Sequence, residues 1–235
     1  MERLNRHLQM IILLIAGILS AESAGAESLY VFYPSFLSAA TVQKQLAKAC
    51  PQIEILVFGR FKDFEDSVLK NMPDAILTKP AVMGQMGGYA ARVSGSRGGS
   101  TEENYVFLSV EKKTDPAALA DKTLGVFDIL GKKGMDMFVG KFISPIPKLR
   151  RVSKMEDLLQ MLTFNMADAI LIPDVYVRYY KEISKLNFTV TPFPGMRDGI
   201  LALGVKQGME APLTVNSLTS LNKTYMALLE VEQWK

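Results

Sequence analysis

Four short loops carry the residues that could do chemistry, and each loop follows an apolar run that predicts a buried strand. The loops are Tyr33-Pro34-Ser35, Thr78-Lys79-Pro80, Asp128 to Gly134, and Pro173-Asp174. In open α/β sheets, loops at the carboxyl ends of the strands face the ligand crevice. Two of the four lead directly into a predicted helix, whose first N–H groups and positive dipole end favour an anion. The pattern therefore predicts a binding site for a small anionic ligand.

The candidate ligand-binding residues come from these loops and from the helix after the last one. They are Tyr33, Ser35, Thr78, Lys79, Asp128, Gly131, Lys132, Lys133, Asp174 and Tyr176. We expect Lys79 and Lys132 to lie in loops outside the cores and to approach the anion from opposite sides. Simpler roles stay open, because Ser35 could only cap a helix, the lysine pair could be a solvated helix start, and a tyrosine could belong to the core. No catalytic residue, metal ligand or cofactor is predicted.

Two scarce residue types limit the chemistry. The only histidine is His7, and the only cysteine is Cys50. Because His7 lies in the N-terminal segment described next, the remaining chain cannot use Ser-His or Cys-His catalysis or histidine-bound zinc. A single cysteine forms no intrachain disulfide, and Cys50 is predicted to be a small buried hydrophobe. An enzyme on this chain would depend on Asp128, Asp174 and Lys79.

The first 26 residues have the features of a secretory signal peptide. Arg3 and Arg6 precede an apolar run from Met10 to Leu19, and Ala24-Gly25-Ala26 offers a small-residue cleavage site. The run is about half as long as a membrane span requires. The segment therefore predicts export to the periplasm, with an uncleaved amphipathic anchor as the alternative.

The elements that must position the four loops belong to a segment that occurs twice in the sequence. Residues 71–77 read Asn-Met-Pro-Asp-Ala-Ile-Leu, and residues 165–171 read Asn-Met-Ala-Asp-Ala-Ile-Leu, so six of seven positions are identical. Each copy follows an apolar strand and an amphipathic helix. Their separation is far too long for a solenoid repeat and favours two similar α/β lobes. Chance is the alternative, because Asp-Ala-Ile-Leu is ordinary in buried strands.

Apolar periodicity and turn residues predict the order of the elements. The first part reads β-α-β-α-β, which requires a parallel sheet with right-handed crossovers. Two helices are expected at 35–49 and 213–234, with Ser35 as the cap of the first. We predict a signal peptide over 1–26, a first lobe over 27–110 and 191–235, and a second lobe over 111–190.

This order resembles the periplasmic solute-binding proteins of the two-lobed, type II kind, and in particular the phosphate/phosphonate-type proteins of ABC transporters. The residues that carry the resemblance are Leu124 to Asp128 before a glycine-flanked helix start, and Glu156 to Leu159 before Ala167-Asp168-Ala169. The resemblance implies an α/β fold with mostly parallel sheets, helices on both faces, and a cleft that closes on a small solute. The chain is shorter than the usual family member, and Gly131 to Gly134 stands where a Ser/Thr-rich loop is common.

Three classes of function remain open at this stage. The resemblance implies a solute-binding protein that serves a membrane permease, and the reduced size favours a partner of a membrane-bound sensor as the alternative. An enzyme on the same fold and a protein-interaction module with a closed cleft are the other two classes. The formal net charge is +3 with both signs mixed along the chain, so no nucleic-acid partner is predicted.

The signal peptide gives a direct test. Protein recovered from the periplasm should begin at or near Glu27, because cleavage follows Ala-Gly-Ala. Intact-mass measurement on native material checks this, and a mass that retains residues 1–26 would contradict it.

Overall fold

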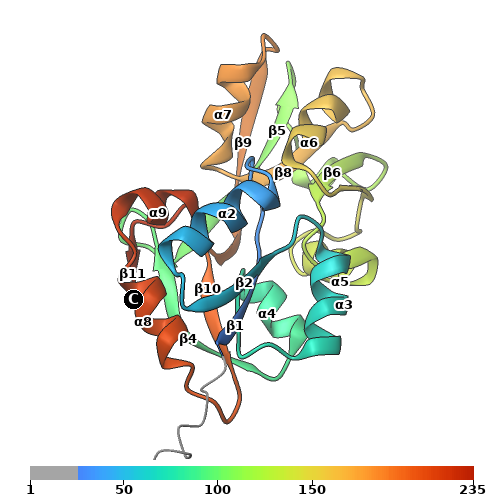
Figure 1. The fold of residues 1–235 in the computed structure, drawn as a ribbon. Coiled ribbons are helices and arrows are strands. Elements are labelled where there is room, and N and C mark those ends of the chain that lie inside the picture. Colours follow the sequence, from blue (N-terminus) through green and yellow to red (C-terminus); the bar gives the residue numbers. More distant parts are fainter. Residues whose placement is uncertain (1–25) are drawn as a thin grey trace, which may run out of the picture.

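The computed structural model describes residues 26–235, whose strands form two sheets (Figure 1). The predicted signal peptide therefore lies outside the described residues, apart from Ala26. The first lobe contains β1 (Glu27–Phe32), α2 (Ala39–Ala49), β2 (Ile53–Val57), α3 (Phe61–Asn71), β3 (Ala75–Thr78), α4 (Pro80–Met86), β4 (Tyr89–Ser96), β10 (Ala202–Lys206), α8 (Pro212–Thr219), α9 (Lys223–Leu228) and β11 (Gln233–Trp234). The second lobe contains β5 (Glu102–Val110), the short 3₁₀ helix η1 (Pro116–Ala118), β6 (Thr123–Phe127), α5 (Gly131–Gly140), β7 (Lys148–Val152), α6 (Met155–Thr163), β8 (Ala169–Pro173), α7 (Tyr176–Ile183) and β9 (Phe188–Gly199).

The two sheets share one pattern of strand pairing. In the first, β1 lies between β2 and β3 in parallel, and β10 adds antiparallel to β3 and then to β4. In the second, β6 lies between β7 and β8 in parallel, and β5 adds antiparallel to β8 and then to β9. The repeated sequence ends in β3 in one sheet and in the equivalent β8 in the other. The predicted two-lobed repeat is confirmed, and each sheet is mixed.

The alternation of side chains along the strands explains the layers. Leu29 and Val31 of β1 point to the face covered by α2 and α8, and Tyr30 and Phe32 point to the face covered by α3 and α4. The second sheet has α6 and α7 on one face and α5 on the other. The two-lobed α/β fold with helices on both faces is therefore confirmed.

One apolar cluster is common to both lobes. It includes Phe32 and Phe61 from the first lobe and Phe127 and Leu130 from the second. The rings of Phe32 and Phe127 stack with their centroids 6.4 Å apart. The Gln85 side-chain amide also donates a hydrogen bond to the Leu130 carbonyl oxygen at 3.1 Å. The lobes are thus held together along α3, α4 and α5.

The chain crosses between the sheets at 97–101 and again at 200–201. These positions differ from the predicted lobe boundaries at 110 and 191, because β5 and β9 both belong to the second sheet. Glu102 to Val110 pair with β9 along the whole of β5, and this long antiparallel pair fixes both strands to β8. Whether each lobe is a separately folding domain stays a prediction.

Two helix predictions need correction. The first helix begins at Ala39, because the Ser38 side chain, and not that of Ser35, accepts the capping hydrogen bond from the Thr41 N–H. The predicted helix at 213–234 is two short helices, α8 and α9, followed by β11. The Asn222 side chain caps α9 and so ends the continuity of the helical pattern. No helix within residues 26–235 is long and apolar enough to cross a bilayer.

The aspartate of each repeat copy anchors the first strand of its lobe. Asp74 accepts hydrogen bonds from the N–H and the hydroxyl of Ser28, both at 2.8 Å. Asp168 accepts one from the N–H of Thr123 at 2.8 Å. Ser28 and Thr123 lie in the equivalent strands β1 and β6. The repeated aspartate therefore has a structural role.

Replacement of this aspartate should destabilise the fold. Asp74→Ala leaves the Ser28 N–H without its acceptor, which should lower the free energy of unfolding by about 1–3 kcal/mol. Urea denaturation measures the loss, and Asp66→Ala is the matched control, because Asp66 makes only an exposed ion pair with Lys62. Equal effects of the two variants would contradict an anchoring role.

Candidate functional site

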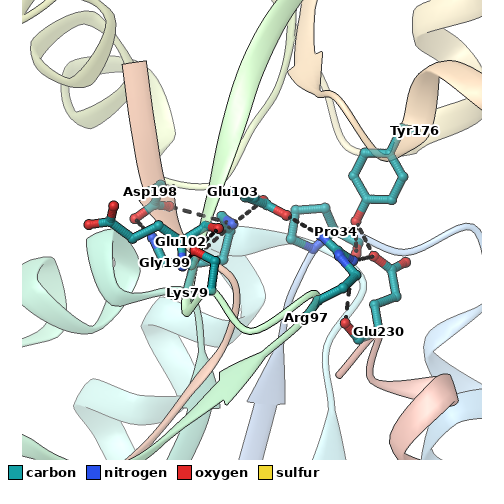
Figure 2. A network of polar contacts seen from close by, with 10 residues as sticks. Pro34, Lys79, Arg97, Glu102, Glu103, Tyr176, Asp198, Gly199 and Glu230 are labelled. Carbon is teal, nitrogen blue, oxygen red and sulfur yellow. Dashed lines mark hydrogen bonds and ion pairs between the residues drawn. The ribbon is translucent and has the colours of Figure 1, made fainter. Parts of the chain in front are cut away.

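A buried lysine lies where the chain passes between the lobes (Figure 2). Lys79 follows β3 and is only 2% exposed. Its Nζ donates to Glu103 Oε1 at 2.6 Å and to the Gly199 carbonyl oxygen at 2.8 Å, with Asp198 Oδ2 at 3.6 Å. Glu103 lies in β5, and Asp198 and Gly199 end β9. One ammonium group thus joins the first sheet to both strands that cross from the second.

Arg97 and Glu230 extend this network to the other side of the crossing (Figure 2). Arg97 donates to Glu103 Oε2 at 2.8 Å and to the Glu230 carbonyl oxygen at 3.3 Å. The Tyr176 hydroxyl, from the second lobe, donates to Glu230 Oε2 at 2.7 Å. Burial raises the pKa of the Glu230 carboxyl group, and the Tyr176 hydrogen bond and the Arg97 charge oppose this rise only in part. The network holds two cations and three carboxyl groups.

The position of Lys79 corrects the expectation that it lies in a loop outside the cores. Its charge is neutralised by internal carboxylates, and removal of either partner from a buried pair is costly. We therefore do not include Lys79 in the proposed site. Thr78, beside it, is fully buried, and its hydroxyl has no hydrogen-bond partner among residues 26–235.

The loop with the lysine pair is already occupied by internal partners. Asp128 Oδ1 accepts the Gly131 N–H at 2.7 Å, and Asp128 Oδ2 pairs with Arg151 at 3.2 Å. This carboxylate takes the place at the start of α5 where an anionic ligand was expected. Gly131 has a positive φ of 68° and faces the Phe61 ring. Lys132 and Lys133 are exposed to solvent.

The remaining predicted residues are spread over the space between the lobes. Tyr33 is buried and donates to the Leu228 carbonyl oxygen at 2.8 Å, and burial raises its pKa. The Ser35 hydroxyl accepts the Leu37 N–H at 3.1 Å. Asp174 is exposed, and Tyr176 is buried.

A cavity of about 570 Å³ lies between the lobes at the carboxyl ends of parallel strands, and we call it the strand-end cavity. The first lobe supplies residues 33–42 after β1 and 57–60 after β2, and the second lobe supplies Phe127 and residues 153–157. Of the ten predicted site residues, Tyr33 and Ser35 line it. Its position agrees with the rule for open α/β sheets, and its volume is typical of small-molecule sites.

The strand-end cavity presents charges of both signs. Arg60 and Lys154 are the N-cap residues of α3 and α6, and neither makes a side-chain capping bond. No side chain of an N-cap residue therefore satisfies the first N–H groups of these two helices, and in α6 the Asp157 N–H donates to the Lys154 carbonyl oxygen at 3.2 Å. Glu156 and Asp157 also line the cavity, and the Arg60 guanidinium group pairs with Asp63 at 2.7 Å. The arrangement suits a ligand with an anionic and a cationic group.

A second cavity, of about 630 Å³, lies on the other side of Phe36, and we call it the aromatic cavity. It is lined from the second lobe by Tyr176 and Tyr179, and from the first by Met226 and Glu230. A third cavity, of about 420 Å³, is lined only by second-lobe residues at the opposite end of the sheet. Four lining residues were not predicted from the sequence, namely Phe36, Arg60, Lys154 and Glu230. The apolar Phe36 directly after Pro34-Ser35 was the one available signal.

Comparisons with known proteins identify the fold. No protein-family model matches the sequence, and no curated protein does. The ligand-binding core of GluR0 in complex with L-glutamate matches with a TM-score of 0.58 and 13% identity, over 88% of this chain and 97% of that one. An ABC uptake transporter substrate-binding protein from Streptococcus pneumoniae with bound histidine matches with a TM-score of 0.56 and 16% identity, over 86% and 90%.

A periplasmic domain of a further protein belongs to the same group of structures. The periplasmic VFT2 domain of BvgS from Bordetella pertussis has a TM-score of 0.54 and 13% identity, over 88% of this chain and 93% of the domain. The chain has the two-lobed fold of type II periplasmic solute-binding proteins. The particular likeness to phosphate- or phosphonate-binding members has no support from these structures.

The role of Lys79 can be tested by stability. Lys79→Met should lower the free energy of unfolding by about 3–5 kcal/mol, because Asp198 would remain buried without a cation and Glu103 would keep only Arg97. Lys132→Met is the matched control and should change it by less than about 0.5 kcal/mol, because Lys132 is exposed. Urea denaturation measures both, and a small effect of Lys79→Met would contradict the assigned role.

Proposed function

We propose that this protein is a periplasmic solute-binding protein whose two lobes hold a small zwitterionic solute in the strand-end cavity. The main support is the cavity itself, which lies between the lobes at the carboxyl ends of β1, β2, β6 and β7. The similar folds of proteins bound to L-glutamate and histidine also support a small solute. The export signal in the sequence supports the periplasmic location.

The proposed ligand differs from the purely anionic solute expected from the sequence. Lys79 is paired inside the protein, and Asp128 occupies the start of α5. The N–H groups at the starts of α3 and α6 would donate hydrogen bonds to a carboxylate, with Lys154 and the Asp63-paired Arg60 beside them. Glu156 and Asp157 would accept an ammonium group from the same ligand.

The proposed partner is a membrane protein that recognises this protein when its two lobes are closed. Delivery to the permease of an ABC transporter is the leading proposal, supported by the similar fold of an uptake protein. The second proposal is a report to a membrane-bound sensor, for which the short length of the chain is the support. We propose no catalytic role.

A thermal-shift panel tests the proposal. The standard amino acids, inorganic phosphate and methylphosphonate should be compared, and an amino acid at about 100 times its Kd should stabilise the protein by about 2.7 kcal/mol. This corresponds to a rise in Tm of about 5–10 °C for a protein of this size. Absence of any stabilisation across the amino acids would overturn the proposal, and stabilisation by phosphate alone would restore an anionic ligand.

A variant that fills the strand-end cavity tests whether the solute binds there. Gly59 lines the strand-end cavity, and a Cβ there meets only Ala39 at 3.7 Å, so Gly59→Phe should fill the cavity and abolish the shift. Gly84→Phe is the matched control, because Gly84 is exposed on α4 and a Cβ there meets no atom within 4 Å. An unchanged shift in Gly59→Phe would place the solute elsewhere.

A further inference from the structure

The aromatic cavity has the composition of a binding site, although it lies outside the strand-end cavity. Phe36 and Tyr179 stack with ring centroids 3.6 Å apart, and Tyr176 meets Phe36 edge to face at 5.4 Å. Met226 of α9 completes the apolar wall. Because α7 and α9 belong to different lobes, the cavity is bounded by both. Apolar walls with a few polar groups are typical of small-molecule sites.

The polar end of this cavity is the Glu230 carboxyl group, with the Arg97 side chain also in the lining. Glu230 lines the cavity, and its side chain is 27% exposed. Oε2 accepts the Tyr176 hydroxyl at 2.7 Å, and the nearest cation, Arg97 Nη1, is 3.7 Å away, beyond hydrogen-bond distance. Within residues 26–235, no donor bonds to Oε1 of Glu230.

Arg97 is shared between two carboxyl groups, because it lies 3.7 Å from Glu230 Oε2 and forms the shorter contact, at 2.8 Å, with Glu103. The network of Lys79, Arg97, Glu103, Asp198 and Glu230 carries one more carboxyl group than cations. At the open rim of the cavity, the positive charge of Lys223 and the negative charge of Glu232 add up to zero. A bound cation would therefore supply the charge that the buried groups lack.

We propose that the aromatic cavity binds a small organic amine, with its ammonium group on Glu230 and its apolar body against Phe36, Tyr179 and Met226. The ammonium group would donate to Oε1 of Glu230 in a partly desolvated place, where charged hydrogen bonds are strong. The aromatic rings add cation–π attraction and apolar contact. An acid of the same shape would meet the Glu230 carboxyl group and is excluded. The observations behind this proposal are separate from those behind the solute proposed for the strand-end cavity.

Three probes of nearly the same shape test whether binding requires a positively charged ligand. Calorimetry on the full mature chain at pH 7 should detect binding of 2-phenylethylamine, and neither 2-phenylethanol nor 3-phenylpropionate should bind to a similar degree. The charged bond to Glu230 should make the amine bind about tenfold or more tightly than the alcohol. Equal binding of amine and alcohol, preferred binding of the acid, or no binding of the amine would each overturn the proposal.

Two substitutions identify the cavity. Glu230→Gln should weaken amine binding by about tenfold or more, because the amide keeps the shape and removes the charge. Glu232→Gln is the control and should have little effect, since Glu232 lies at the rim and bonds to the Gly98 N–H. Equal losses in both variants would overturn the proposal. Ala227→Trp, from an exposed position on α9, should block the cavity without touching Glu230.

The two proposed sites can fail separately. Gly59→Phe fills only the strand-end cavity and should leave amine binding intact, whereas Ala227→Trp should abolish amine binding and leave the thermal shift by an amino acid intact. Loss of amine binding in Gly59→Phe, with an unchanged melting temperature of the free protein, would move the amine to the strand-end cavity and overturn this inference.

Discussion

The ion pair between Lys79 and Glu103 sets the relation of the two lobes. A buried ammonium group is tolerated only when surrounding oxygens replace its water. For Lys79 those oxygens belong to Glu103, Asp198 and Gly199, which lie in the two strands that pass between the sheets. Both crossings must therefore converge on the end of β3. The same groups place Arg97, and through it Glu230, at the edge of the aromatic cavity.

The repeated half of each lobe could be predicted from the sequence because its signals are local. Buried parallel strands such as Ala75–Thr78 are continuous apolar runs, and the amphipathic helices before them carry a clear period. The lobe boundaries could not be predicted in this way. An apolar run such as Tyr105 to Val110 has the same appearance in either sheet, and its membership depends on pairing with β9, some 80 residues later. The final helix was too long because Asn222 was not recognised as a cap.

The candidate site was harder to predict, because the partners of its charged residues lie far away in the sequence. A lysine between a strand and a proline has the pattern of a ligand-binding cation, and Lys79 finds its partners 24 and 120 residues away in the sequence. The capping role of Asp128 could have been predicted from the local sequence, since an aspartate three residues before Gly131 is a natural capping group. Glu230 gave no signal, because it fell within a predicted helix. Tyr33 and Ser35 line the strand-end cavity, because the chain after β1 must leave the sheet at its carboxyl end, and their role in binding stays a prediction.

The apolar cluster shared by the two lobes determines how a partner protein can detect that a ligand is bound. Separation of the lobes would expose part of this cluster, including Phe32 and Phe61, to water, and this exposure would cost free energy. A ligand shifts a conformational equilibrium only by its difference in affinity for the two states. Both cavities have walls from both lobes, so a molecule in either one binds the closed form more tightly than an open form. By linkage, a molecule in one cavity must then strengthen binding in the other. The two sites would act in the same direction on any partner that distinguishes closed from open lobes.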